Sequence, residues 1–267
     1  MKDSKIQYTL HLADNSLILG QRNSEWCGHG PVLEQDIAIT NISLDLIGQA
    51  RNFYQYAATL INEQAQLSES VNPPPSGGGR GATEDSLAYL RKEREFKNCL
   101  LVEQPNGDWA QTILRQYLFS QYQYLLFEQL QNKKDEQIAA IATKALKEVA
   151  YHLRWSSEWV IRLGDGTEES HYRMLKAIDE LWRYTGEMFI PADYEKEMGI
   201  DFVMIKQEWE QKVKQISDEA SLILPPTGGG GGAFMQSGGK EGKHTEHLGF
   251  ILTELQYMQR AYPGCEW

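Results

Sequence analysis

The sequence predicts an all-α protein, a bundle of about eight helices of which four are long enough to form a core. Apolar residues recur at helical spacing through most of its 267 residues. No stretch shows the sustained alternation and hairpin turns that strands require. Two Pro/Gly-rich stretches, residues 72–82 and 225–242, interrupt the pattern, and neither composition supports a helix. We therefore predict one helical domain over residues 1–267 with two surface loops.

The first two predicted helices span residues 5–22 and 31–64. The earlier one has Tyr8, Leu12 and Leu19 on one stripe, and the later one begins near Pro31, a favoured place for proline. The helix over 31–64 is apolar on two sides. Val32, Leu33, Ile37 and Leu44 mark one side, and Ile39, Ile42, Leu46, Phe53 and Leu60 mark the other. Such a helix is usually central, so we expect others to surround it.

The remaining helices are expected over residues 84–103, 108–131, 135–163, 168–189, 201–221 and 244–261. Thr83 and Asp108 are suitable caps for the first two of these. The helix over 135–163 carries a long apolar stripe and stops at Gly164, where we expect a left-handed backbone to end it.

Composition excludes several classes of function. The chain has 26 Lys and Arg against 37 Asp and Glu, a net charge of −11, which disfavours binding to nucleic acid or to an anionic membrane. No apolar run is long enough to span a bilayer. The three cysteines, Cys27, Cys99 and Cys265, show no CxxC spacing, as is typical of free thiols, and predict a cytoplasmic location.

A helical bundle with acidic residues raises the question of a di-iron carboxylate centre. Such a centre takes one Glu from each of two helices and Glu-x-x-His from each of two others. This sequence has no Glu-x-x-His. Its nearest matches are Glu148 with His152, and Glu246 with His247 in the run HTEH at 244–247. We favour structural roles for both: a buried histidine beside a flanking carboxylate, and a helix start with Glu246 suited to the helix dipole.

Three charged residues are candidates for contact with a ligand. Arg115 lies in an aromatic-rich helix and could bind a carboxylate or a phosphate, although a structural ion pair is the default interpretation. Glu34 and Asp36 suit the dipole at the start of their helix, and contact with a substrate is the alternative.

Several long motifs resemble the PaaC-type subunit of bacterial phenylacetyl-CoA epoxidase. They are EWCGH at 25–29, NISLDLIGQARNF at 41–53, LVEQPNG at 101–107, KEVAYHLR at 147–154, RLGDGT at 162–167 and KHTEHLG at 243–249. The resemblance spans nearly the whole chain. The two Pro/Gly-rich loops are longer than is usual in the family, which affects local surface detail only.

The resemblance implies a ferritin-like four-helix bundle with additional helices. It also implies pairing with a homologous catalytic subunit that holds a di-iron centre, with a reductase subunit that supplies electrons from NADPH. The complex would use O2 to epoxidise the ring of phenylacetyl-CoA in aerobic phenylacetate breakdown. In this family the PaaC-type subunit is structural, and we name Glu34, Asp36 and Arg115 as candidate contacts to the CoA ester.

Alignment by motif places the catalytic subunit's iron ligands on six residues here: Ser16, Leu46, Gln49, Ser120, Val149 and His152. One imidazole remains and no carboxylate, so this set cannot balance the charge of two iron ions. We therefore expect no catalytic residue and no cofactor in this chain.

Two alternatives remain open. One is an independent ferritin-like metalloenzyme that uses Glu148, His152, Glu246 and His247. The other is a ferritin-like binding or storage module with no link to an oxygenase.

Overall fold

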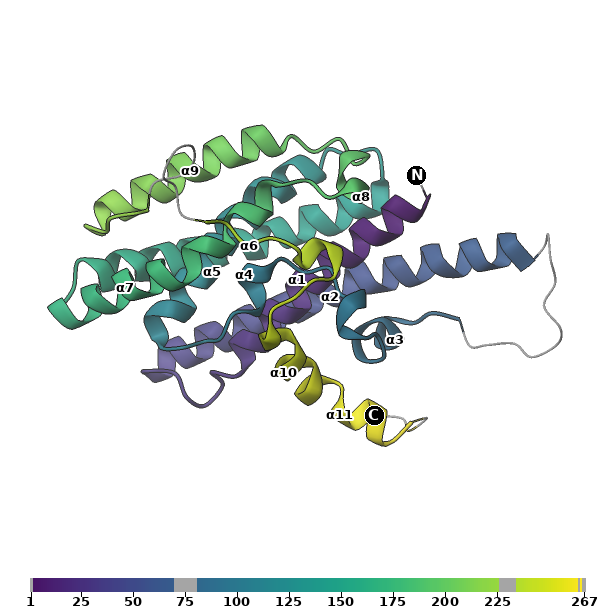
Figure 1. Ribbon diagram of the computed structural model, residues 1–267, viewed down its shortest axis with the longest axis horizontal. Helices are drawn as coiled ribbons and strands as arrows, with labels where there is room; N and C mark the ends of the chain where they lie inside the picture. Colours follow the sequence, from purple (N-terminus) through teal and green to yellow (C-terminus); the bar gives the residue numbers. More distant parts are fainter. Residues whose placement is uncertain (1, 70–80, 226–233, 264, 266–267) are drawn as a thin grey trace.

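The computed structural model describes residues 2–69, 81–225, 234–263 and 265, and every regular element in those ranges is a helix (Figure 1). Four long helices dominate: α1 (Lys2–Ser24), α2 (Leu33–Glu69), α5 (Trp109–Leu130) and α6 (Glu136–Gly164). The all-α, ferritin-like prediction is confirmed.

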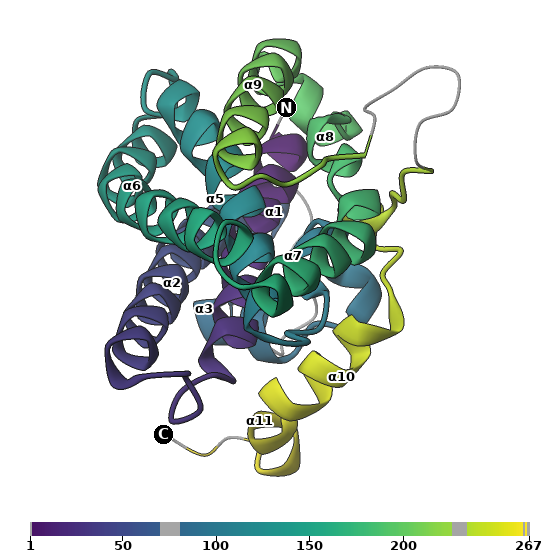
Figure 2. The same cartoon turned by 90° about the vertical axis from the view of Figure 1, so that its left-hand side faces the viewer.

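The four long helices pack in pairs. α1 lies along α2, α5 lies along α6, and α2 and α6 contact each other across the bundle. Two further helices, α7 (Glu168–Leu181) and α9 (Phe202–Glu219), cover α5 and α6 on the other side (Figure 2). The apolar faces meet in one core, in which the rings of Phe53 and Phe127 lie 6.2 Å apart between α2 and α5. This packing leaves α2 at the edge of the molecule (Figure 2).

Side-chain caps fix where several helices begin. Asp108 accepts a hydrogen bond from the backbone N–H of Gln111 at the start of α5, and Thr83 accepts one from Ser86 at the start of α3 (Glu84–Tyr89). Both caps satisfy backbone donors that a helix end leaves free. The predicted starts at Thr83 and Asp108 are therefore confirmed.

The predicted single helix over residues 84–103 is wrong. This stretch forms three short pieces: α3, η1 (Glu93–Glu95) and α4 (Leu100–Glu103). The cause is a set of tertiary hydrogen bonds to α1. Asp14 accepts from the backbone N–H of Lys97 (2.8 Å), and Asn15 accepts from that of Cys99 (2.8 Å). These bonds replace the intrahelical ones, so tertiary contacts override the local helical pattern.

Two other predicted helices are also interrupted. Residues 168–189 form α7, η2 (Trp182–Tyr184) and η3 (Gly186–Phe189), and residues 244–261 form α10 (Glu246–Leu255) and α11 (Tyr257–Ala261). The second break falls at Gln256, whose buried amide donates to the carbonyls of Ala88 and Arg91. A short helix, α8 (Asp193–Lys196), was not predicted.

Gly164 ends α6 as predicted, but not through a left-handed backbone. The following cap residue, Asp165, has φ −97°, and Gly164 is not among the glycines with positive φ. A Cβ on Gly164 would lie 2.5 Å from the carbonyl oxygen of Ala220. The glycine is needed there because the chain after α9 passes directly against α6.

The two predicted loops are described only in part. Residues 81–83 and 234–238 are irregular, and a short turn, η4 (Gly239–Glu241), follows the second. The rest of the first predicted loop, residues 72–80, and residues 226–233 of the second lie outside the described residues.

Candidate functional site

The six positions predicted to correspond to iron ligands all lie in the interior of the bundle. Ser16, Leu46, Gln49, Ser120, Val149 and His152 are fully or almost fully buried. The hydroxyl of Ser16 donates to the carbonyl of Leu12 (3.2 Å), and that of Ser120 accepts from the amide of Gln116 (2.8 Å). Leu46 and Val149 belong to the apolar core. Four of the six therefore make ordinary core contacts.

The other two, Gln49 and His152, are parts of polar contacts between α2 and α6. The Gln49 amide donates to Glu148 (2.9 Å) and accepts from Gln123 (3.1 Å). His152 Nε2 lies 3.0 Å from a carboxylate oxygen of Asp45. Asp45 is the partner that sequence reasoning missed. Asp45 and Gln49 are one helical turn apart and contact the turn of α6 that carries Glu148 and His152, and the sequence carries no local signal of this alignment of the two helices.

This donor set does not fit a pair of iron ions. The six positions offer one imidazole, and the two nearby carboxylates, Asp45 and Glu148, are held by His152 and Gln49. In the ranges that the structure describes, no three His, Cys, Asp or Glu residues are grouped so that they could share a metal ion. Two metal ions buried here would keep most of their charge uncompensated.

The HTEH run holds the C-terminal segment to the bundle. Glu103, buried in α4, accepts hydrogen bonds from the Thr245 backbone N–H (2.7 Å) and hydroxyl (2.8 Å). His244 lies 2.8 Å from the same carboxylate and 2.9 Å from the carbonyl of Phe96. Burial lowers the pKa of His244, but the hydrogen bond and charge of Glu103 outweigh this, and the pKa is raised overall. The motif therefore has a structural explanation that needs no metal.

Glu246 and His247 do not join Glu148 and His152. They lie on α10, which packs on α1, α4 and η1, whereas Glu148 and His152 lie on α6 and bind side chains of α2. Glu246 is exposed in the first turn of α10. The four residues of the alternative metal site are thus divided between two separate places.

Arg115 is fully buried and has no carboxylate partner among the described residues. Its guanidinium donates to the Gln104 carbonyl (2.5 Å) and to the side-chain oxygens of Asn106 (2.6 Å) and Asn23 (3.3 Å). Desolvation, with a smaller effect of Arg22, lowers the pKa of Arg115 to about 9. The default interpretation of a structural ion pair is therefore wrong about the partner. Arg115 has a structural role, but it binds neutral oxygens and not a carboxylate.

Glu34 and Asp36 lie in the first turn of α2, and neither is among the hydrogen-bond partners of Arg115. Glu34 is exposed, and Asp36 accepts from the backbone N–H of Gly30 (2.9 Å), which lowers the pKa of Asp36. The structure does not bring the three candidate CoA contacts into one site. Their contact with a CoA ester stays a prediction, which the burial of Arg115 does not favour.

One apolar face of α2 is uncovered. Exposed fractions are 72% for Leu33, 52% for Ile37, 62% for Leu44 and 39% for Ile47, whereas Ile39, Ile42, Leu46 and Phe53 on the opposite face are fully buried. The two apolar sides predicted from the sequence are confirmed. The expectation that other helices of this chain surround α2 is wrong. We call Leu33, Ile37, Leu44, Ile47 and Gly48 the α2 stripe.

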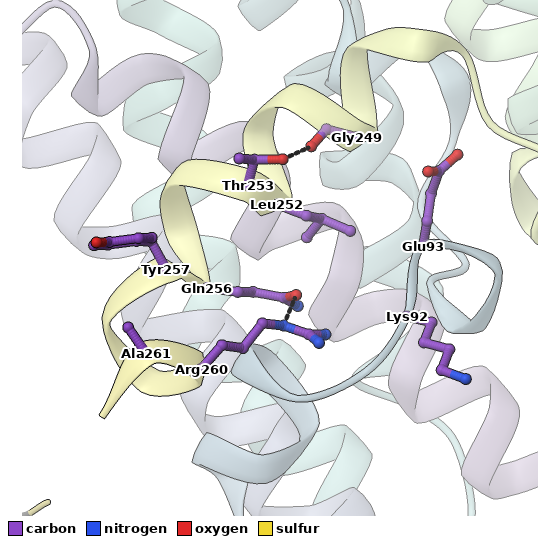
Figure 3. Close-up of a pocket in the computed structure, with 9 residues that line it drawn as sticks. All are labelled: Lys92, Glu93, Gly249, Leu252, Thr253, Gln256, Tyr257, Arg260 and Ala261. Carbon is purple, nitrogen blue, oxygen red and sulfur yellow. Dashed lines mark hydrogen bonds between the residues drawn. The ribbon is translucent and has the colours of Figure 1, made fainter. Parts of the chain in front are cut away.

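The cavity in Figure 3 has a volume of about 520 Å³ and lies between α10–α11 and the start of η1. Arg260 donates to Gln256 (2.9 Å) and to the Arg91 carbonyl (3.0 Å), and Thr253 donates to the Gly249 carbonyl (2.8 Å). Glu93 and Tyr257 also line the cavity, but no hydrogen bond links the lining side chains into a catalytic set. In the described part of the chain, no helix is long and apolar enough to cross a membrane.

The fold defines a ferritin-like helical protein, and the positions predicted to correspond to iron ligands hold no carboxylate. The model of the family described as phenylacetic acid catabolic protein matches residues 1–267, and the chain belongs to this family. It is 45% identical, over 97% of its own length and 98% of the relative's, to the C subunit of the 1,2-phenylacetyl-CoA epoxidase of Escherichia coli (strain K12). The resemblance to PaaC-type subunits is confirmed.

Proposed function

We propose that this chain is a non-catalytic structural subunit of a phenylacetyl-CoA epoxidase complex in aerobic phenylacetate catabolism. The observation that carries the proposal is the interior of the bundle, where six ligand positions hold Ser16, Leu46, Gln49, Ser120, Val149 and His152. The name of the relative, an epoxidase subunit, supports the assignment to a complex.

In this proposal the chain binds a homologous catalytic subunit, which holds the di-iron centre and epoxidises the ring of phenylacetyl-CoA. A reductase subunit delivers electrons from NADPH. The contribution of the present chain is a rigid, preformed helical surface. Small displacements of reacting groups cost much rate, so a partner that fixes the helices around the iron centre can raise activity without touching the substrate.

Co-expression tests the proposal. The chain and the catalytic subunit of the same host are produced together and separately, and each preparation is assayed for phenylacetyl-CoA epoxidation with the reductase and NADPH. We expect a stable complex on gel filtration, activity in the complex and none in the present chain alone. Absence of a complex, or epoxidation by the isolated chain, would contradict the proposal.

The alternatives are not favoured by any specific observation. An independent metalloenzyme would need Glu148, His152, Glu246 and His247 at one site, and the structure places them at two. A storage module without an oxygenase partner would fit the fold but not the likeness to an epoxidase subunit. A cytoplasmic location stays a prediction.

A further inference from the structure

The α2 stripe contains a glycine that has no structural reason within this chain. Gly48 lies in the interior of α2, where glycine lowers helix stability relative to alanine. A Cβ added there would meet no atom within 4 Å, and the backbone of Gly48 is ordinary helix rather than a positive-φ conformation. Neither close packing inside the chain nor backbone geometry therefore calls for glycine at this position.

On another side of α2, a glycine of the neighbouring helix α1 allows the two helices to pack closely. On α1, a Cβ at Gly20 would lie 3.2 Å from Leu46 Cβ, 3.3 Å from Ile47 Cγ1 and 3.4 Å from the Ser43 carbonyl. The α1–α2 crossing is thus a close approach that a glycine makes possible, as ridges-into-grooves packing allows. Gly48 would allow another helix to approach the exposed side of α2 equally closely. No helix of the described chain lies on that side.

The surroundings of Gly48 suit a helix of another protein. Leu33, Ile37, Leu44 and Gly48 follow one another at four- and seven-residue spacing, so they form one line on the helix surface. The line extends over fifteen residues, about 22 Å at 1.5 Å per residue, which is the length of four helical turns. An exposed apolar line of this length on one helix is the usual mark of a helix-in-groove contact.

Charges beside the α2 stripe indicate the chemistry of the partner. Glu34 and Asp45 on α2 and Glu148 on α6 flank it, and in the described residues none of the three is paired with a lysine or arginine. The basic residue at the far end of the stripe, Arg51, is turned to Glu84 (3.6 Å). A partner helix with an apolar face and flanking lysines or arginines would complement this surface.

We infer that the α2 stripe is the docking surface for a helix of the catalytic subunit, with Gly48 at the point of closest approach. This inference rests on the proposed function, since the chain is taken to be a subunit that binds such a partner. A second copy of this chain is the less favoured occupant. Two copies of α2 packed together would place the acidic residues Glu34 and Asp45 of one copy against those of the other.

Substitutions at Gly48 test the inference. The full-length chain is co-expressed with the catalytic subunit as wild type, Gly48→Ala, Gly48→Leu and Phe250→Ser. Phe250 on α10 is 66% exposed and provides a matched apolar control on another surface. Affinity is measured by titration of the purified subunits, and thermal unfolding of each isolated variant shows that it is folded.

The expected result is a complex with Gly48→Leu that is weaker by roughly 100-fold or more, because a branched side chain separates the two helices. Gly48→Leu should unfold at or above the wild-type temperature, since leucine favours a helix and has open space there. Phe250→Ser should bind as wild type does, and Gly48→Ala should fall between. Hydrogen exchange of residues 33–51 should slow in the wild-type complex.

Wild-type affinity in Gly48→Leu would overturn this inference and leave the proposed function intact. The same holds if Phe250→Ser alone loses the complex, or if Gly48→Leu dissociates only a homodimer. A wild-type chain that binds no catalytic subunit would contradict the proposed function itself.

Discussion

Buried polar residues connect parts of this chain that are far apart in the sequence, and Arg115 is one example. Its guanidinium holds the irregular segment after α4 through Gln104 and Asn106, and reaches α1 through Asn23. A guanidinium can satisfy three acceptors in one plane, whereas an ammonium cannot hold the same geometry. Burial, with a smaller effect of Arg22, lowers the pKa of Arg115, and none of its hydrogen-bond partners carries a negative charge to oppose this.

Arg115→Lys should therefore be more harmful than Arg115→Met. The lysine keeps a buried charge and loses most of the hydrogen bonds, so we expect the free energy of unfolding to fall by about 2–4 kcal/mol. The methionine removes the buried charge and should cost less. Urea unfolding at pH 7 measures both values, and a lysine variant as stable as wild type would contradict this account.

His244 should make stability depend on pH. Its pKa is raised in the folded protein, so its contribution is fully present below the unfolded value of about 6.5 and is lost as pH rises through the folded value. We expect the difference in unfolding free energy between wild type and His244→Gln to shrink between pH 6 and pH 9. A difference that grows with pH would show that Glu103 does not bind the protonated ring.

The comparison must be between variants, because His11 works in the opposite direction. Burial lowers the pKa of His11, with Glu195 partly opposing it, so its contribution is present above the unfolded pKa and is lost as pH falls below it. The difference between wild type and His244→Gln cancels this effect.

At the scale of the helices, two glycines differ in their surroundings. One is packed against another part of the chain, and the other is not. Gly164 on α6 approaches the backbone of Ala220, whereas Gly48 on α2 faces open space. The same substitution should thus have opposite effects at two sites that look alike in the sequence.

Gly164→Ala should lower the free energy of unfolding by about 1–3 kcal/mol, because the added methyl group meets a carbonyl that cannot move without shifting the chain. Gly48→Ala should raise it by up to about 1 kcal/mol through helix propensity alone. Urea titrations of the two isolated variants provide the measurement. Equal effects at the two positions would mean that the close approach at Gly164 is absent.

Helix positions could be predicted wherever an apolar stripe and a local cap agreed, as at α5 and α6. The prediction failed where a side chain far along the chain replaced the local hydrogen bonds, as Asp14 and Asn15 do for residues 97–99. The burial of the six predicted ligand positions could be predicted from the sequence, but their hydrogen-bond partners could not. The pairing of His152 with Asp45 depends on how α2 and α6 are aligned, which no local pattern specifies.

Considered whole, the molecule combines a closed core with an apolar surface on one side that no helix of the described chain covers. The core of the four long helices is closed by apolar contacts and by polar contacts such as Gln49 with Glu148. The apolar side chains of the α2 stripe are exposed, and α2 lies at the edge of the bundle (Figure 2). The absence of carboxylates from the six predicted ligand positions, together with a long exposed apolar line, is what we expect of a subunit that supports another.

The iron content of the purified chain, alone and with the catalytic subunit, tests this account most directly. Both preparations come from cells grown with added iron, and metal analysis is combined with mass determination by light scattering. We predict only trace iron in the isolated chain, and in the complex about two iron ions for each catalytic subunit, none of them held by the present chain. About two iron ions retained by the isolated chain would contradict the central claim.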